Sequence, residues 1–306
     1  MRAGLVILLL IIAGVKLRAQ DTTVVFVITD TLAADTSPWK LTGLSTFNFS
    51  QVSLNNWNGG GQSAISGTSL VNAKLTYTGK KTLFENTLNA AFGLQRLQKQ
   101  GTVKTDDKLE FLTTYGREAF GKWYYTVSGS FRSQFAPGYN YPNDSTVISR
   151  FLAPGYVTFG LGLENKIRDC FTIFISPISA KYTIVQDDSL SAQGAFGVDP
   201  GKRLREEYGG SARIIFSCPL IENVNFATQM DLFSNYSKNP ENVDVNWTTL
   251  ISFKVNRFIT TSISTSLVYD DDVIIKQDKN DDGILDVEGP RTQFKEVFNF
   301  GLQYKF

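Results

Sequence analysis

The chain has 306 residues, and its 30 Lys and Arg against 29 Asp and Glu leave a formal net charge of +1. This balance leaves no overall basic field that would argue for nucleic-acid binding. The sequence contains no histidine, which excludes Ser-His-Asp and Cys-His nucleophiles and imidazole metal sites.

The first segment has the features of a signal peptide. Arg2 and the basic stretch 16–18 flank the uncharged apolar run 5–15, which is too short to span a membrane as a helix. Ala19 supplies a small residue at a position suitable for cleavage. We therefore expect residues 1–20 to be removed on export, and residues 21–38 to form a short periplasmic N-terminal segment.

From Trp39 onward, apolar and polar residues alternate in long segments. A period of two indicates strands with one apolar and one polar face. In one such segment, Trp247 and Ile251 alternate with Asn246 and Thr248. The segments that we predict as strands are 39–54, 63–78, 82–96, 106–120, 123–135, 154–167, 170–186, 204–217, 222–236, 244–256, 257–270 and 291–306.

The connections between these segments also alternate, in this case between tight turns and longer loops. Tight turns are expected near residues 79–81, 121–122, 168–169, 218–221 and 256–257, and longer loops near 55–62, 97–105, 136–153, 187–203, 237–243 and 271–290. Short periplasmic turns, long extracellular loops and an even strand number are typical of outer-membrane barrels. We therefore predict an all-β fold over residues 39–306: a transmembrane, antiparallel, up-and-down β-barrel of about twelve strands.

The last predicted strand carries a possible assembly signal. Its apolar face consists of Phe298, Phe300, Leu302, Tyr304 and Phe306, the last being an aromatic carboxyl terminus. This arrangement resembles the terminal strand that outer-membrane assembly machinery recognises, so we expect the barrel-assembly machinery as a partner during biogenesis. The alternative is an amphipathic edge strand of a soluble sandwich, although globular strands are usually shorter.

Several motifs resemble a known family. They are NFSQVSLNNWNGGG from Asn48, FAPGY at 135–139, LFSNY at 232–236 and VNW at 245–247. Together with the Phe306 ending, they resemble an uncharacterised family of Bacteroidota-type outer-membrane barrels, catalogued as a domain of unknown function. The resemblance covers nearly the whole mature chain. It implies a barrel in the outer membrane of a Gram-negative bacterium, and it implies no particular activity.

The polar faces of the predicted strands carry charges of both signs. The lumen-lining candidates are Lys74, Glu85, Glu110, Glu118, Arg132, Glu164, Lys181, Arg205, Glu207, Arg213, Asp231, Lys254 and Lys295. Charges inside a low-dielectric wall are costly unless they are paired or hydrated. Two interpretations remain: a salt-bridged network that fills a narrow barrel, or a hydrated path in which rings of charge select solutes.

These features predict an integral, porin-like outer-membrane protein surrounded by membrane lipid, acting as a passive pore or channel for small polar solutes. The alternative is a structural or assembly barrel that binds a partner and has a plugged lumen. Paired carboxylates such as Glu110 and Glu118 could serve acid–base chemistry. Mixed charges in a lumen produce such pairs without catalysis, however, so we expect no enzyme. The oligomeric state stays open.

The segment 278–289, DKNDDGILDVEG, resembles a calcium loop. The candidate ligands are Asp278, Asn280, Asp282, Asp286 and Glu288. The first four match positions one, three, five and nine of such a loop, whereas Glu288 stands one residue before the position of the usual bidentate Glu. Two interpretations therefore remain. One is a calcium site that is weak or needs help from residues 270–272, and the other is an acidic, solvated Asp-Gly turn.

Cys170 and Cys218 are the only cysteines. Export to an oxidising compartment permits a disulfide, and the predicted topology places both residues at the same rim of neighbouring strands. A bridge requires their Cα atoms to lie about 4.4–6.8 Å apart. The alternative is two unpaired cysteines near turns.

Overall fold

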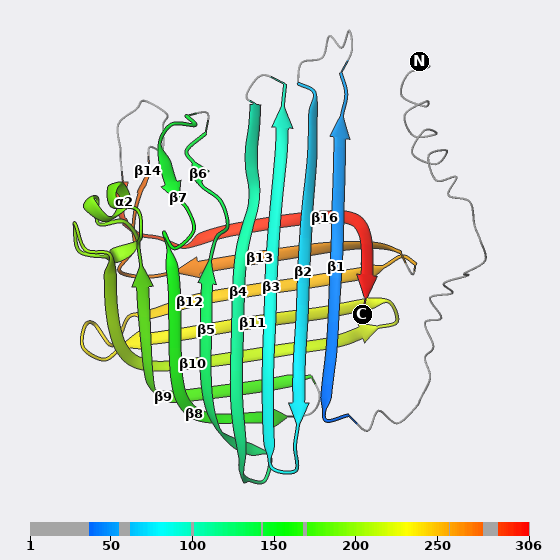
Figure 1. The fold of residues 1–306 in the computed structure, drawn as a ribbon, viewed down its shortest axis with the longest axis vertical. Coiled ribbons are helices and arrows are strands. Elements are labelled where there is room, and N and C mark those ends of the chain that lie inside the picture. Colours follow the sequence, from blue (N-terminus) through cyan, green and yellow to red (C-terminus); the bar gives the residue numbers. More distant parts are fainter. Residues whose placement is uncertain are drawn as a thin grey trace. The chain divides into compact units, whose positions relative to one another are not determined.

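The computed structural model describes residues 37–54, 62–98, 101–141, 143–167, 170–256, 258–277 and 287–305. Residues Pro38–Phe306 form one compact unit, shown as a ribbon in Figure 1. The expected signal peptide and almost all of the expected N-terminal segment lie outside the described residues. Within the described ranges, no helix is long and apolar enough to cross a membrane.

Twelve strands of the described chain form a closed barrel in the order β1-β16-β13-β12-β11-β10-β9-β8-β5-β4-β3-β2. They are β1 (Trp39–Val52), β2 (Ala64–Thr78), β3 (Thr82–Leu97), β4 (Gly101–Phe120), β5 (Trp123–Ser133), β8 (Gly155–Ile167), β9 (Phe171–Ile184), β10 (Leu204–Ile221), β11 (Val224–Asn235), β12 (Val243–Lys254), β13 (Ile259–Tyr269) and β16 (Gln293–Lys305). All their pairings are antiparallel. The prediction of a closed antiparallel barrel of about twelve strands is confirmed.

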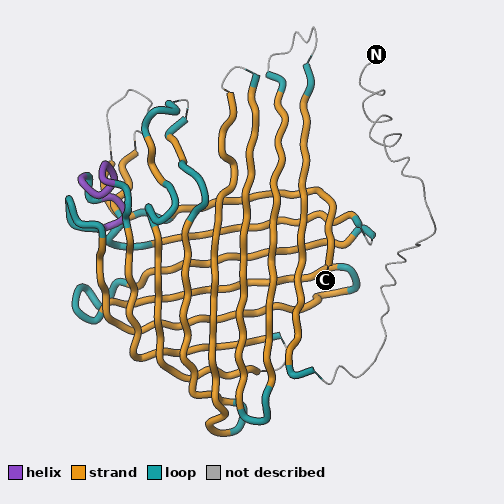
Figure 2. The backbone as a smooth tube through the Cα atoms, in the orientation of Figure 1, coloured by secondary structure: helices purple, strands orange, loops and turns teal. Residues whose placement is uncertain are grey.

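The first and last strands close the barrel. β1 pairs with β16 from Leu44↔Lys305 to Asn48↔Gly301. In Figure 2, the strands of one wall run nearly crosswise to those of the opposite wall, as expected when strands tilt strongly against a barrel axis. We call the end with the tight turns the turn side and the end with the long loops the loop side.

The loop side has more secondary structure than the sequence indicated. The loops carry β6 (Gly138–Tyr139), β7 (Val147–Ser149), α2 (Asp188–Ala192), η1 (Ala195–Gly197), β14 (Ile274–Gln277) and β15 (Val287–Pro290). β6 pairs with β7, and β14 pairs with β15. These elements are too short to show a hydrophobic period, so the sequence predicts only loops for their residues.

Two predicted boundaries are wrong. β4 begins at Gly101 instead of residue 106, and β10 continues to Ile221, so the turn expected at 218–221 lies at Glu222–Asn223. Residues 101–104 pair with 94–97 of β3 although they have no apolar face. Backbone pairing with the neighbouring strand therefore extends these strands beyond the segment in which apolar and polar residues alternate.

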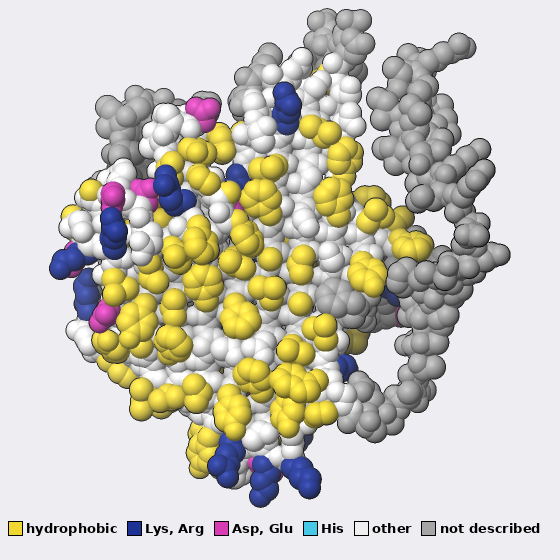
Figure 3. Space-filling view, viewed as in Figure 1, with side chains coloured by type: hydrophobic (Ala, Val, Ile, Leu, Met, Phe, Trp, Pro, Cys, Tyr) yellow, Lys and Arg dark blue, Asp and Glu magenta, His cyan; other side chains and the backbone are white. Residues whose placement is uncertain are grey.

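The outward face of the barrel is apolar over most of its area. Phe47, Phe159, Ile178, Phe298 and Phe300 are all more than half exposed. Figure 3 shows hydrophobic side chains spread across the strands and charged side chains gathered toward the ends. Monomeric soluble proteins rarely expose apolar patches of this extent, whereas a lipid-facing wall requires one.

Aromatic side chains concentrate near both ends of this apolar wall. On the turn side, Trp39 packs on Tyr77 with ring centroids 4.9 Å apart, and Phe120 packs on Trp123. Toward the loop side, Tyr182 and Tyr208 lie 6.5 Å apart, and so do Phe92 and Phe135. Such girdles mark the two membrane–water interfaces of transmembrane barrels.

The apolar wall leads to a prediction about depth in the membrane. Phe298 lies midway along β16 and is 70% exposed, whereas Phe294 of the same face lies near the loop-side end. Phe298→Arg should lower the free energy of unfolding by about 2–4 kcal/mol, and Phe294→Arg by about 0–1 kcal/mol. Denaturant titration of protein refolded into lipid vesicles measures both. Equal costs would contradict a membrane centred on the middle of β16.

Candidate functional site: the barrel interior

Contacts between strands that are not neighbours identify the inward face of the wall. Lys295 Nζ lies 2.6 Å from Asp106 Oδ1, although β1, β2 and β3 separate β16 from β4. Arg213 Nη1 of β10 donates a hydrogen bond of 3.1 Å to Ser128 Oγ of β5, across β9 and β8. Neighbouring strands lie about 4.8 Å apart, so these contacts pass through the interior.

The cross-strand register extends this assignment around the barrel, because paired residues point to the same side of a sheet. The inward set includes Lys74, Glu85, Glu110, Glu118, Arg132, Glu164, Lys181, Arg205, Glu207, Arg213, Asp231, Lys254 and Lys295. Glu118 and Lys254 are exposed at the turn-side ends of β4 and β12, whereas Arg132 and Arg205 lie near the loop-side ends of β5 and β10. The register thus places every lumen-lining candidate on the inward face.

A first group, the loop-side cluster, consists of Lys181, Arg205, Glu207, Asp244, Asp270 and Asp272. Lys181 is its centre: Nζ lies 2.5 Å from Asp244 Oδ2, 2.8 Å from Asp270 Oδ2 and 3.6 Å from Glu207 Oε2. The Lys181 ammonium also lies 5.5 Å from the ring centroid of Phe233. An ammonium with three carboxylates and an aromatic face around it is fully engaged by protein groups.

Arg205 links this cluster to the mouth of the barrel. Its Nη2 donates to Glu207 Oε1 at 2.7 Å and also contacts the carboxylate of Asp272. Lys238 Nζ donates to the other Asp272 oxygen at 2.9 Å. Partial burial of Asp272 opposes its ionisation, but the hydrogen bond from Lys238 and the charge of Arg205 outweigh it and hold the pKa of Asp272 below its usual value.

A small hydrophobic core braces the loops next to this cluster. Ala153, Val185, Leu190 and Val198 are buried together. α2 begins after Asp187, which accepts a hydrogen bond from Leu190 N at 3.0 Å and forms an ion pair with Arg150. Arg205 Nη1 donates to Gly197 O of η1 at 3.3 Å. The loop-side mouth is therefore built from packed loops joined to inward charges.

A second group, the turn-side cluster, consists of Lys74, Glu85, Glu164 and Lys166. Glu85 accepts from Lys74 at 2.8 Å and from Lys166 of β8, and β4 and β5 lie between β3 and β8. Lys166 also lies 3.8 Å from Glu164. Lys74, Glu85 and Glu164 border an internal cavity of about 70 Å³. The ion pair between Glu85 and Lys166 thus joins two strands that are not neighbours.

The inner wall also carries charged pairs outside the two clusters, and some inward charges are exposed. Arg213 Nε pairs with Asp231 at 2.5 Å, and Lys108 pairs with Glu110 at 2.9 Å. The inward side chain of Lys295 is 46% exposed, and that of Lys74 in the turn-side cluster is 44% exposed. Water therefore reaches charged groups on the inner wall.

Sequence reasoning missed several partners in these clusters. Lys166 and Asp244 share the alternation of the predicted inward residues Glu164 and Asn246, so the period of two could have found them. Asp106 lay at the start of a predicted strand, and its partner Lys295 is 189 residues away. No local pattern indicates such a pairing.

The structure describes only part of the candidate calcium loop. Asp278, Asn280, Asp282 and Asp286 lie outside the described residues, and Glu288 contributes its backbone to β15. Residues 270–272, which were expected to assist a calcium ion, are engaged elsewhere. Asp270 and Asp272 form the ion pairs given above, and Asp271 accepts hydrogen bonds from Asn242 and Tyr269.

Cys170 and Cys218 are joined by a disulfide, and their Cα atoms lie 5.2 Å apart. The bridge lies at the turn-side end of β9 and β10, where Ser217 N donates to Cys170 O at 2.8 Å. The predicted assembly signal is the apolar face of β16. Phe298, Phe300, Leu302 and Tyr304 all point outward and are at least 59% exposed, and Phe306 lies outside the described residues.

Fold and interior together define the class of protein: a closed twelve-stranded antiparallel barrel, apolar outside and lined with charged residues inside. A protein family described as "Protein of unknown function (DUF3078)" matches residues 49–139, from the end of β1 to β6. No curated protein matches the chain.

Several solved structures are similar to this chain. An outer-membrane channel from Pseudomonas putida F1 is 10% identical over 87% of this chain and 95% of that chain, with a TM-score of 0.38. The NanC porin is 11% identical over 87% of this chain and 100% of that chain, with a TM-score of 0.36. The translocator domain of the autotransporter NalP from Neisseria meningitidis is 10% identical over 91% and 92% of the two chains, with a TM-score of 0.36.

Proposed function

We propose that this protein is an integral outer-membrane barrel that acts as a passive channel for small polar solutes. The observation that carries the proposal is the solvent access of inward charges such as Lys74 and Lys295, because a filled scaffold would exclude water from them. The exposed apolar wall and its aromatic girdles support the membrane location.

The two clusters set the expected selectivity of the channel. In the loop-side cluster, four carboxylates face two inward cations, and Lys238 adds a third from the loop. The turn-side cluster has two carboxylates and two lysines. Rings of unbalanced charge select the opposite ion, so the loop-side mouth favours cations and narrow, hydrated polar solutes.

Planar-bilayer recording tests the channel. The purified protein should give small, discrete conductance steps with a reversal potential on the cation-selective side under a salt gradient. Lys166→Ala removes a contact that crosses the interior and leaves Glu85 paired with Lys74, so it should raise the conductance and strengthen cation selectivity. Lys122→Ala, in the turn between β4 and β5, is the matched control and should change neither.

The recordings also separate this function from a plugged scaffold. Vesicle-inserted, folded protein that passes no ions at any voltage would refute the channel. Lys166→Ala with wild-type conductance would show that the turn-side cluster does not limit the path. Co-purification of a fixed partner with a non-conducting barrel would favour a structural or assembly role.

A further inference from the structure

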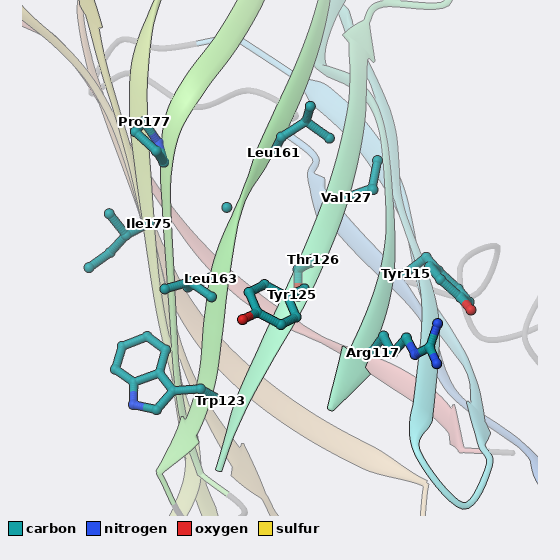
Figure 4. Close-up of a pocket in the computed structure, with 11 residues that line it drawn as sticks. Tyr115, Arg117, Trp123, Tyr125, Thr126, Val127, Leu161, Leu163, Ile175 and Pro177 are labelled. Atoms are coloured by element: carbon teal, nitrogen blue, oxygen red, sulfur yellow. The ribbon is translucent and has the colours of Figure 1, made fainter. Parts of the chain in front are cut away.

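The outer wall is hollowed on the turn side. A groove of about 720 Å³ crosses the outer faces of β4, β5, β8 and β9, within the range of about 300–1,000 Å³ that is common for small-molecule sites. Figure 4 shows Tyr115 and Arg117 on one side and Trp123, Leu163, Ile175 and Pro177 on the other. Nearly all the lining side chains are apolar or aromatic.

A bulge in the wall shapes this groove. Leu161 pairs with Ile178, but Leu163 pairs with Ile175, so β9 has one residue more than β8 at this point. A Cβ on Gly162 would lie 2.0 Å from Ile175 O, and only glycine permits this approach. Ser176 Oγ lies 2.9 Å from Leu161 O and 2.8 Å from Ile178 O, so polar backbone groups at the bulge keep partners.

One cation stands at the edge of the groove. Arg117 is exposed on the outward face of β4, next to the turn at Gly121–Lys122. Within the described part of the chain, its guanidinium has no hydrogen bond or ion pair. Trp123 and Tyr125 beside it belong to the turn-side girdle, which lies at headgroup level. A guanidinium at that level, above an apolar groove, matches a phosphate joined to an acyl chain.

We propose that the groove binds one anionic glycerophospholipid of the surrounding leaflet, with an acyl chain along Val127, Leu161 and Ile175 and its phosphate on Arg117. This inference rests on the proposed membrane location. It goes beyond general contact with lipid, because it assigns a single site, a headgroup charge and the residue that recognises it.

Tryptophan quenching tests the site, because Trp123 lines the groove. The protein would carry Trp39→Phe, Trp57→Phe and Trp247→Phe, leaving Trp123 as the reporter. It would be refolded into phosphatidylcholine vesicles containing phosphatidylglycerol with brominated acyl chains. We expect phosphatidylglycerol to be enriched roughly fivefold next to Trp123 over its mole fraction, the effect of one basic side chain on an anionic lipid.

Two variants and a control make the test specific. Arg117→Gln should lower the quenching to the level expected from the mole fraction of phosphatidylglycerol. Lys122 is a neighbouring exposed cation outside the groove, so Lys122→Gln should leave the enrichment intact. Val127→Phe fills the groove while keeping Arg117 and should also abolish the enrichment. The gel shift of unheated samples confirms that each variant is a folded barrel.

Two results would overturn the lipid site. One is quenching of Trp123, in the protein that keeps Arg117, no stronger than the mole fraction of phosphatidylglycerol predicts; the other is enrichment that survives Arg117→Gln. The proposed function fails differently: the protein would not insert into vesicles or would not conduct. A barrel that inserts and conducts without enriching phosphatidylglycerol would refute this inference alone.

Discussion

Lys181→Met should lower the free energy of unfolding by about 3–5 kcal/mol, the cost of removing one partner from a buried ion pair. The Lys181 side chain is only 9% exposed, and its ammonium is held between Asp244, Asp270 and Glu207. Methionine preserves most of the apolar length but leaves these carboxylates facing each other. Denaturant unfolding in vesicles would measure the loss.

A matched control variant and a second substitution that restores stability distinguish the effect of the lost charge from that of altered packing. Lys254→Met changes an inward lysine at the exposed turn-side rim and should cost no more than about 0.5 kcal/mol. Adding Asp270→Asn to Lys181→Met removes one of the uncompensated charges and should recover part of the stability. If Lys181→Met were as stable as the control, the loop-side cluster would not contribute to folding.

Removing the disulfide should have a comparable effect. Cys170 and Cys218 are 48 residues apart, and closing a loop of that length stabilises a folded chain by roughly 4 kcal/mol in the chain-entropy description. Cys170→Ser with Cys218→Ser should therefore lower the unfolding free energy by about this amount. The wild-type protein unfolded with a thiol reductant should lose the same stability, and the double variant should not respond to the reductant.

Removing the disulfide should lower stability without changing the folded structure. The neighbouring strands already hold positions 170 and 218 together through the hydrogen bond from Ser217 N to Cys170 O. Conductance of the double variant should match the wild type. A cost below about 1 kcal/mol would show that the unfolded chain is already restricted by the membrane.

The barrel wall could be predicted because each step of the reasoning was local. Along β13, Ser262 and Ser264 alternate with Ile263 and Thr265, and the pleat sends successive side chains to opposite faces whatever the neighbours are. For the same reason, the inward direction of Glu164 or Arg213 followed from the alternation alone. The short helices and hairpins of the loops did not, since elements of two to five residues show no period.

By itself, the sequence determined the fold class, the two faces of each strand, and the set of charges available to the interior. Only the tertiary structure decided which charges meet. Lys181 reaches Asp270, and Lys295 reaches Asp106, across an interior whose width depends on closure of the ring between β1 and β16. The groove beside Arg117 likewise depends on four strands and on the one extra residue in β9. Periodicity is a property of one strand, whereas curvature and closure are properties of the whole barrel. Distances across the barrel therefore cannot be predicted from the sequence of any single strand.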